Sequence, residues 1–183
     1  MQRPDADIAF VLLAAGHSKR FGGDKLASQF NGKPLYRWAV EAADRAGFPS
    51  RYLVTGAHSS ISAPDGWQEV ANRHASEGMG TSIAAGVAAA RHHPRLVIGL
   101  ADMPKMTATH LCRLATGDTP IFTRQDDGSP GCPAAFGRDS YADLMTLTGD
   151  RGARALAGEN ANVIDPANKS LLFDVDTPED LGG

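Results

Sequence analysis

The sequence has few of the features that mark secreted, membrane or nucleic-acid-binding proteins. Its 183 residues include only two cysteines, Cys112 and Cys132, which lie twenty positions apart and form no CxxC motif. Two such residues make neither a disulfide framework nor a zinc site, which is typical of a reducing compartment. No apolar run approaches the roughly 20 residues that span a bilayer. With 18 basic and 21 acidic residues the net charge is -3, so no basic field favours a nucleic acid as partner.

One apolar segment near the start of the chain is similar to the core of a signal peptide. The segment Ile8–Gly16 (IAFVLLAAG) ends in small residues, as a cleavage site does. However, Asp5 and Asp7 precede it, where a signal peptide carries positive charge. These flanks argue against export, and we expect a cytoplasmic protein with no membrane partner.

Strand-like and helix-like patterns alternate along the chain. Apolar runs predict strands over Ile8–Leu13, Arg51–Thr55, Trp67–Ala71, Leu96–Leu100, Ile121–Thr123 and Ser170–Val175. Helical spacing and capping residues predict helices over Leu35–Ala46, Ser82–Arg91, Thr107–Ala115, Ser140–Leu147 and Thr177–Leu181. This alternation predicts one α/β domain over residues 1–183, a Rossmann-like three-layer unit with a mostly parallel sheet. Within it, Arg124–Cys132 is rich in turn-forming residues and is expected to be a looser insertion.

Three side chains in or beside these helices are expected to have structural roles. His92 and His93 follow the second predicted helix, where cations favour the helix C-terminus. Cys112 is predicted to be a small core residue of the third.

The loop after the first strand has the composition of a phosphate site. Residues 13–25 (LAAGHSKRFGGDK) contain three glycines, three fixed cations and one acid, Asp24. Glycines bring backbone N–H groups close to a ligand, and lysine and arginine bind phosphate oxygens. The spacing fits neither GxGxxG nor the Walker motif, and the structural alternative is a solvated turn with surface cations. Its place at the carboxyl end of a buried strand favours an anion site. In such a sheet, the loops after Leu100 and Val175 are the other places where a ligand is expected.

At this point a family resemblance becomes specific. LAAGHSKRFGGDK resembles the signature LAAGxSxRxGxxK of nucleotidyltransferases that form a nucleotide-linked product and release pyrophosphate, and FNGKPLYRWAVEAA resembles its continuation. Further stretches are similar to the molybdenum cofactor cytidylyltransferase (MocA-like) group of the MobA-like NTP transferases: EGMGTSIAAG, LADMP, GCPAAFGRDSYADLMTLTGDRGAR and FDVDTPEDL. The resemblance covers nearly the whole chain.

Two carboxylates are candidates for a metal site. Mg²⁺ typically takes one or two protein carboxylates together with phosphates and water. Asp102 and Asp176 each follow a predicted strand, and the alternative for Asp102 is a cap on the next helix. Asp174 shares a strand face with Asp176, so periodicity does not separate the two. The resemblance makes Asp102 the principal ligand and Asp176 the second, with Mn²⁺ as the alternative to Mg²⁺.

The resemblance also assigns the groups that hold the triphosphate. Arg20 would bind the β- and γ-phosphates and Lys25 the α-phosphate under attack, so Arg20, Lys25 and Asp102 are the predicted catalytic residues. Backbone contacts to the nucleotide are assigned to Leu13, Ala14, Ala15 and Gly16.

Base choice is predicted from fewer residues. Guanylyl-transferring relatives show LAGG where this chain has LAAG, and they carry an aspartate near Asn72. An amide offers both a donor and an acceptor, which suits cytosine, so CTP is expected rather than GTP. The segment GMGTS is expected to close over the base or ribose through Gly80, Thr81 and Ser82.

The acceptor implied by the resemblance is molybdopterin cofactor, whose terminal phosphate attacks the α-phosphorus without a general base. Residues 129–136 and 148–154 are expected to face it, with Arg151 and Arg154 either pairing with its phosphate or lying on the surface. A molybdenum hydroxylase or its chaperone would then receive the product. Alternatives are GTP, a sugar or alditol phosphate acceptor, and a non-catalytic nucleotide-sensing or cofactor-handover module. The last is disfavoured because a mere binder does not need Lys25, Asp102 and Asp176 together.

Overall fold

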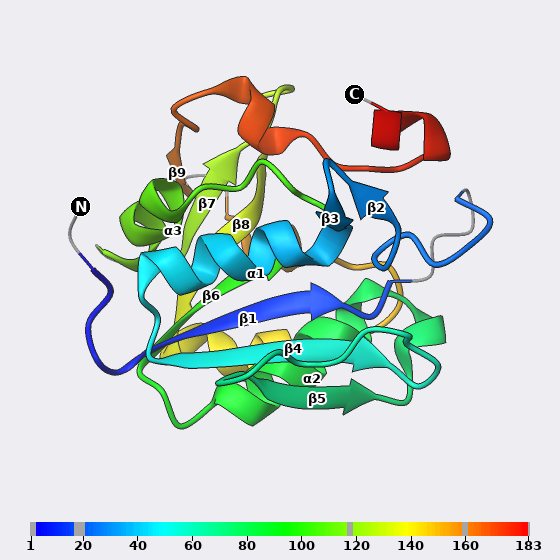
Figure 1. Cartoon of the computed structure of the whole chain (residues 1–183). Helices are drawn as coiled ribbons and strands as arrows, with labels where there is room; N and C mark the ends of the chain where they lie inside the picture. The colour runs from blue at the N-terminus through cyan, green and yellow to red at the C-terminus, as the bar shows by residue number, and fades with distance from the viewer. Residues whose placement is uncertain (1–2, 17–20, 117–118, 159–160, 183) are drawn as a thin grey trace.

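The computed structural model describes residues 3–16, 21–116, 119–158 and 161–182. Seven strands form the main sheet in the order β5-β4-β1-β6-β8-β7-β9 (Figure 1). β1 is parallel to β4 and β6, β4 to β5, and β7 to β9, whereas β8 is antiparallel to β6 and β7. The strands are β1 (Ile8–Ala14), β4 (Ser50–Gly56), β5 (Gln68–Asn72), β6 (Arg95–Leu100), β7 (Ile121–Arg124), β8 (Pro130–Gly137) and β9 (Asn162–Ile164). A separate small hairpin joins β2 (Gln29–Phe30) to β3 (Lys33–Pro34).

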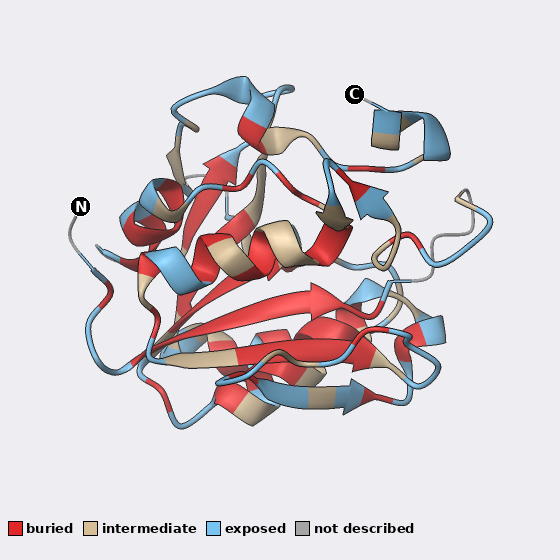
Figure 2. Ribbon diagram, in the orientation of Figure 1, coloured by how far each residue is buried: buried red, intermediate tan, exposed pale blue. Residues whose placement is uncertain are grey.

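Helices cover both faces of this sheet, which confirms the predicted three-layer α/β architecture. One face packs against α1 (Leu35–Ala46) and α3 (Ala108–Ala115), the other against α2 (Met79–Ala90) and α4 (Tyr141–Met145). Because β1 lies between helices on both sides, all seven of its residues are buried (Figure 2). In the described part of the chain, no helix combines the length and apolarity that crossing a membrane requires.

The predicted insertion at Arg124–Cys132 is wrong, because the segment is an ordered hairpin between β7 and β8. The N–H of Gln125 donates to the carbonyl of Ser129 over 2.8 Å, and Gly128 takes the positive φ of 83° that the turn needs. The glycine and proline that predict a loop are tolerated here, since Pro130 is the first residue of β8. Because these residue types usually indicate a loop, the sequence did not predict β8, which is antiparallel to both of its neighbours in the sheet.

The predicted strand Ser170–Val175 is also wrong. A short 3-10 helix spans Lys169–Leu172 instead, and the Asn168 side chain caps it by accepting from the N–H of Ser170 over 2.9 Å. The apolar residues of this segment are buried without forming a strand. Leu171 and Val175 are both buried, although neither pairs with a strand of a sheet. The predicted helix after it is a 3-10 helix over Pro178–Gly182.

His93 is not the exposed helix-end cation that its position suggests. Its side chain is buried, and burial, followed by the charge of His92, lowers its pKa. Its Nδ1 lies 3.1 Å from the carbonyl of Asp7, and its Nε2 lies 3.2 Å from the hydroxyl of Tyr52. A neutral His93 therefore ties the end of α2 to β4 and to the chain before β1. Cys112 is a buried core residue of α3, as predicted.

Candidate nucleotide and metal site

Three segments that are distant in sequence meet at the carboxyl ends of β1 and β6. Directly after β6, the N–H of Ala101 donates to the carbonyl of Leu13 over 3.0 Å. The N–H of Val175 donates to the carbonyl of Asp102 over 3.0 Å. The loops that follow Leu13, Leu100 and Val175 are therefore neighbours in space, and their side chains share one edge of the sheet.

A lysine joins two carboxylates at this edge. Lys25 Nζ lies 2.8 Å from Asp102 Oδ2 and 3.8 Å from Asp176 Oδ1. The side chain of Lys25 is only 9% exposed, against 26% for Asp102 and 54% for Asp176. Burial, together with the charges of Asp176 and Asp102, raises the pKa of the neighbouring Asp174. Lys25 forms an ion pair with Asp176, so the geometry favours Asp176 over Asp174 as the partner of Asp102.

The donor set fits a hard divalent cation. Carboxylate oxygens are the ligands that Mg²⁺ and Mn²⁺ prefer, and Mg²⁺ commonly takes one or two of them while phosphates and water complete its coordination. Asp102 and Asp176 supply that number. Among the described residues, no group of three or more His, Cys, Asp or Glu side chains is arranged to hold a metal ion.

Asp180 holds the segment that carries Asp176. Its Oδ2 accepts from the N–H of Asp176 over 3.0 Å, from the N–H of Thr177 over 2.8 Å, and from Thr177 Oγ1 over 3.0 Å. These hydrogen bonds to the charged form lower the pKa of Asp180. Asp180 is therefore a capping acid that fixes the turn beside the site.

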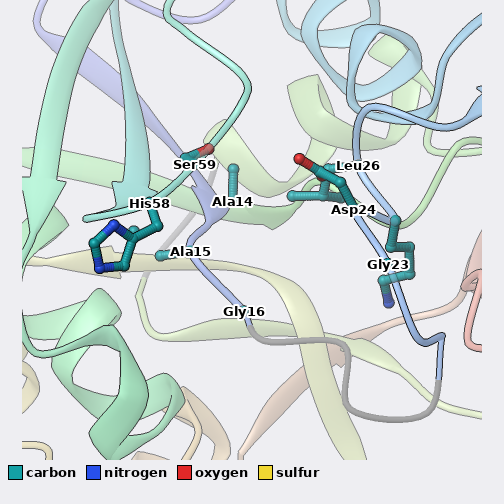
Figure 3. Close-up of a pocket in the computed structure, with 10 residues that line it drawn as sticks. Ala14, Ala15, Gly16, Gly23, Asp24, Leu26, His58 and Ser59 are labelled. Carbon is teal, nitrogen blue, oxygen red and sulfur yellow. The ribbon is translucent and has the colours of Figure 1, made fainter.

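A cavity of about 250 Å³ opens next to this edge (Figure 3). The end of β1 and the segment before β2 form two of its walls, and the close-up shows Asp24 and Ser59 facing each other across it. Four of the predicted nucleotide-binding residues, Lys25 among them, lie in its lining, whereas Arg20 lies outside the described residues. The lining is Ala14, Ala15, Gly16, Gly23, Asp24, Lys25, Leu26, Gly56, His58 and Ser59.

The loop after β4 contributes to the cavity, although no residue of it was predicted to belong to the site. Gly56, His58 and Ser59 line the cavity, and Ser60 Oγ donates to Asp24 Oδ2 at its mouth. The loop carries no phosphate-type motif, but its position was available from the topology. Because β4 is parallel to β1, the residues after both strands emerge at the same edge.

Asn72 and the start of α2 form a separate cluster beside the cavity. Asn72 pairs with Gly56 in the sheet and is buried. Its Nδ2 donates to Thr81 Oγ1 over 2.9 Å and to Ser82 Oγ over 3.0 Å, while its Oδ1 accepts from the N–H of His74 over 2.9 Å. Both amide hydrogens are thus engaged within the protein. The cluster fixes the turn that leads into α2.

Glycines let the start of α2 approach another loop closely. α2 begins at Met79, three residues before the predicted start, because Gly78 serves as its N-cap. The N–H of Gly80 donates to the carbonyl of Gly149 over 2.8 Å. Gly78 has a φ of 117°, and a Cβ built there would lie 2.3 Å from the carbonyl carbon of Gly149. The segment GMGTS therefore packs against residues 148–150 in this structure.

This packing makes a stability prediction. In Gly80→Ala the added Cβ would lie 2.7 Å from the backbone nitrogen of Thr148, and backbone atoms cannot move aside as a flexible side chain can. We expect a loss of about 1–3 kcal/mol in the free energy of unfolding, measured by urea denaturation. Gly158→Ala is the matched control, because nothing lies within 4 Å of its added Cβ. Equal stability of the two variants would contradict the packing argument.

Most of the first segment expected to face an acceptor, residues 129–136, belongs to β8. Cys132 lies in this strand, close enough to Asp102 that the aspartate charge, added to the larger effect of burial, raises the thiol pKa to about 12. Its thiol is therefore neutral at physiological pH. Arg151 and Arg154 are exposed near this side, and Arg154 belongs to a 3-10 helix over Ala153–Leu156.

Comparison with known proteins agrees with this arrangement. Residues 10–163 match the model of the MobA-like NTP transferase domain. The chain belongs to this family. It is 31% identical to Nicotine blue oxidoreductase of Paenarthrobacter nicotinovorans, over 95% of this chain and 94% of that protein. A shorter part, 32% of this chain and 27% of the other, is 39% identical to a Probable molybdenum cofactor guanylyltransferase of Pyrococcus furiosus.

A solved structure extends the family likeness to the fold. Rv0371C of Mycobacterium tuberculosis H37Rv, in complex with manganese, has a TM-score of 0.75 and 26% identity over 95% of both chains. The resemblance of residues 13–25 to a nucleotidyltransferase signature is therefore confirmed at the level of the family. The family model matches from within β1 to within β9.

Proposed function

We propose that this nucleotidyltransferase transfers CMP from CTP to the terminal phosphate of molybdopterin cofactor and releases pyrophosphate. The observation that carries the proposal is the position of Lys25 between Asp102 and Asp176, at the edge of a cavity whose lining includes residues 14–16. A cation and a pair of carboxylates beside an anion-binding loop are the groups that transfer at an α-phosphorus requires.

The roles follow from the chemistry of each group. Backbone N–H groups after β1 would bind phosphate oxygens, and the Lys25 ammonium would stabilise charge on the α-phosphate. Asp102 and Asp176 would hold Mg²⁺ or Mn²⁺, whose charge neutralises the leaving pyrophosphate. An oxygen of the acceptor phosphate forms the new bond to the α-phosphorus, and the bond from that phosphorus to the β-phosphate oxygen breaks. The acceptor is already an anion, so no side chain has to remove a proton.

Support for CTP comes from the LAAG sequence, because the free acceptor of Asn72 does not distinguish cytosine from guanine. Thr81 and Ser82 occupy both amide hydrogens of Asn72, so its donors are not free to bind a base. Oδ1 retains one lone pair beyond the one that the N–H of His74 uses. That lone pair suits the amino group at position 4 of cytosine. It also suits a donor of guanine, so the choice rests on LAAG, which stands where guanylyl-transferring relatives show LAGG.

The test is pyrophosphate release by the purified protein with Mg²⁺ and molybdopterin cofactor, each NTP being offered separately. We expect release with CTP alone and a product whose mass is that of the cytosine dinucleotide form of the cofactor. Release with GTP alone would keep the mechanism and overturn the base choice. Turnover only with a sugar or alditol phosphate would overturn the acceptor. Nucleotide binding without turnover on any acceptor would favour a sensing or handover module.

An oxidoreductase is the second candidate, because the relative at 31% identity carries that name. The assay that distinguishes the two candidates measures oxidation of a reduced nicotinamide or flavin by the protein in the absence of NTP. Redox turnover that survives Asp102→Asn would favour this candidate. Transfer that depends on Asp102 would favour the first.

A further inference from the structure

The atoms that would hold a divalent cation are already paired with a protein cation. Lys25 Nζ donates to Asp102 Oδ2 over 2.8 Å and lies 3.8 Å from Asp176 Oδ1. Its side chain is 9% exposed, whereas that of Asp176 is 54% exposed. The ammonium therefore lies on the inner side of the two carboxylates, and a metal ion would arrive from the open side.

A divalent cation and this ammonium cannot both take full advantage of Asp102. A metal ion bound at Oδ2 would compete with the ammonium of Lys25 for that oxygen, and wherever it binds the carboxylate, two positive charges about 4 Å apart repel strongly at a partly buried site. An ammonium displaced from its carboxylates, and still buried, needs another anion to compensate its charge. A nucleotide triphosphate in the adjoining cavity is such an anion.

The chain around Lys25 allows this exchange of partners. Gly22, with a φ of 70°, and Gly23 precede it, and a Cβ at either position would meet nothing within 4 Å. The neighbouring Asp24 does not compete for the ammonium, because its Oδ1 accepts from the N–H of Ala27 over 3.3 Å and its Oδ2 from Ser60 Oγ. Lys25 also lines the cavity itself, so the move from carboxylates to phosphate is short for a flexible side chain.

We propose that Lys25 is an exchangeable counter-ion that couples metal binding to nucleotide binding. The inference rests on the proposed nucleotide and metal site, and it assigns Lys25 a role before the chemical step. When Lys25 turns to the α-phosphate, Asp102 is released for the metal ion, and when a metal ion binds Asp102, Lys25 is released for the phosphate. Each ligand therefore raises the affinity for the other by the same factor, and the metal ion alone binds weakly.

The test measures Mn²⁺ binding in the absence of nucleotide, by the loss of the free-ion electron paramagnetic resonance signal. Lys25→Met keeps the length of the side chain and removes its charge, and Lys25→Ala provides a second variant. We expect both to bind Mn²⁺ at least about tenfold more tightly than the unmodified protein. Lys33→Met is the matched control, since it removes one charge from a different ion pair, with Glu41, and is expected to leave the affinity unchanged.

A second measurement adds a non-hydrolysable CTP analogue. The analogue is expected to tighten Mn²⁺ binding strongly in the unmodified protein and much less in Lys25→Met. In the absence of nucleotide, adding Asp102→Asn to Lys25→Met is expected to abolish the gain in Mn²⁺ affinity that Lys25→Met produces, because the metal ligand is lost. Affinity in Lys25→Met equal to or weaker than that of the unmodified protein would overturn the inference, as would a gain that survives Asp102→Asn.

The two proposals can fail separately. Pyrophosphate release by the unmodified protein, combined with no gain in Lys25→Met, would overturn the counter-ion role alone. A tenfold gain in Mn²⁺ affinity in a protein that releases no pyrophosphate on any acceptor would support the role of Lys25 at the cation site and overturn the transfer reaction.

Discussion

Asp102→Asn is expected to lower the rate of nucleotidyl transfer by about 1,000-fold. Asparagine keeps the size and one acceptor oxygen of the side chain but loses the charge that holds a divalent cation. Metal stabilisation of a phosphoryl-type transition state amounts to several kcal/mol, and each 1.36 kcal/mol is a factor of ten in rate. The measurement is pyrophosphate release under saturating CTP and Mg²⁺.

The control for this prediction is Asp165→Asn. Asp165 also forms an ion pair, with Arg124 Nε over 2.8 Å, but it is 74% exposed and away from the cavity. We expect its activity to stay within about twofold of the unmodified protein, because exposed ion pairs contribute little. If Asp102→Asn retained more than a tenth of the activity, the assignment of Asp102 as the principal metal ligand would be wrong.

Acid is expected to destabilise the protein through His110. The side chain is 1% exposed, and its Nε2 lies 2.8 Å from Thr123 Oγ1. Thr123 donates its own hydrogen to the carbonyl of Pro133 over 2.6 Å, so Nε2 of His110 is the donor in the first contact. Burial, followed by the charge of Arg113, lowers the pKa of His110 from 6.5 to about 4. The imidazole is therefore neutral in the folded protein.

The direction of the pH effect follows from which state takes up the proton first. Below pH 6.5 the unfolded chain binds a proton at His110 while the folded protein does not, until the pH approaches about 4. Stability is therefore full above pH 6.5 and is lost between there and pH 4, by about 3 kcal/mol.

His110→Gln supplies the comparison, because its amide can still donate to Thr123 but does not titrate. Urea midpoints at pH 7, 6, 5 and 4 measure both proteins, and carboxylates that titrate in the same range contribute equally to each. We expect the stability of the variant to fall by about 3 kcal/mol less than that of the unmodified protein over this range. Parallel pH profiles would show that His110 is not the group responsible.

The parts of the fold that the sequence predicts are those with local signals. β1 and β6 are apolar runs, α1 ends at Gly47 in the left-handed conformation, and Thr107 caps α3 by accepting from the N–H of His110. β8 was not predicted, because a segment of proline, glycine and small residues can have the same composition in a loop as in a strand that is buried between two others. Ser170–Val175 was misassigned for the opposite reason, since an apolar residue such as Val175 is buried outside the main sheet, in a cluster with Phe30 of β2 and Leu35 of α1.

The site divides along the same line. The Gly16-to-Lys25 loop and Asp102 are indicated by composition, by position after predicted strands and by family resemblance. The strand predicted before Asp176 is absent, so family resemblance alone indicated that residue. The cavity wall after β4 does not, because His58 and Ser59 acquire meaning only once β4 is known to be the parallel neighbour of β1. The closed hydrogen bonding of Asn72 is equally non-local, as it depends on how α2 approaches β5.

The strand order also separates the proposed nucleotide side of the sheet from the proposed acceptor side. β4 and β5, with the cavity beside them, lie on one side of β1, whereas β8 and β7 lie on the other side, beyond β6. Groups that would contact a nucleotide thus come mainly from the first 72 residues, and groups that would contact an acceptor come from later ones. A lineage could therefore replace its acceptor by exchanging the β8 region while inheriting its nucleotide pocket intact, and a chimaera joined between the two regions would carry the preferences of both parents.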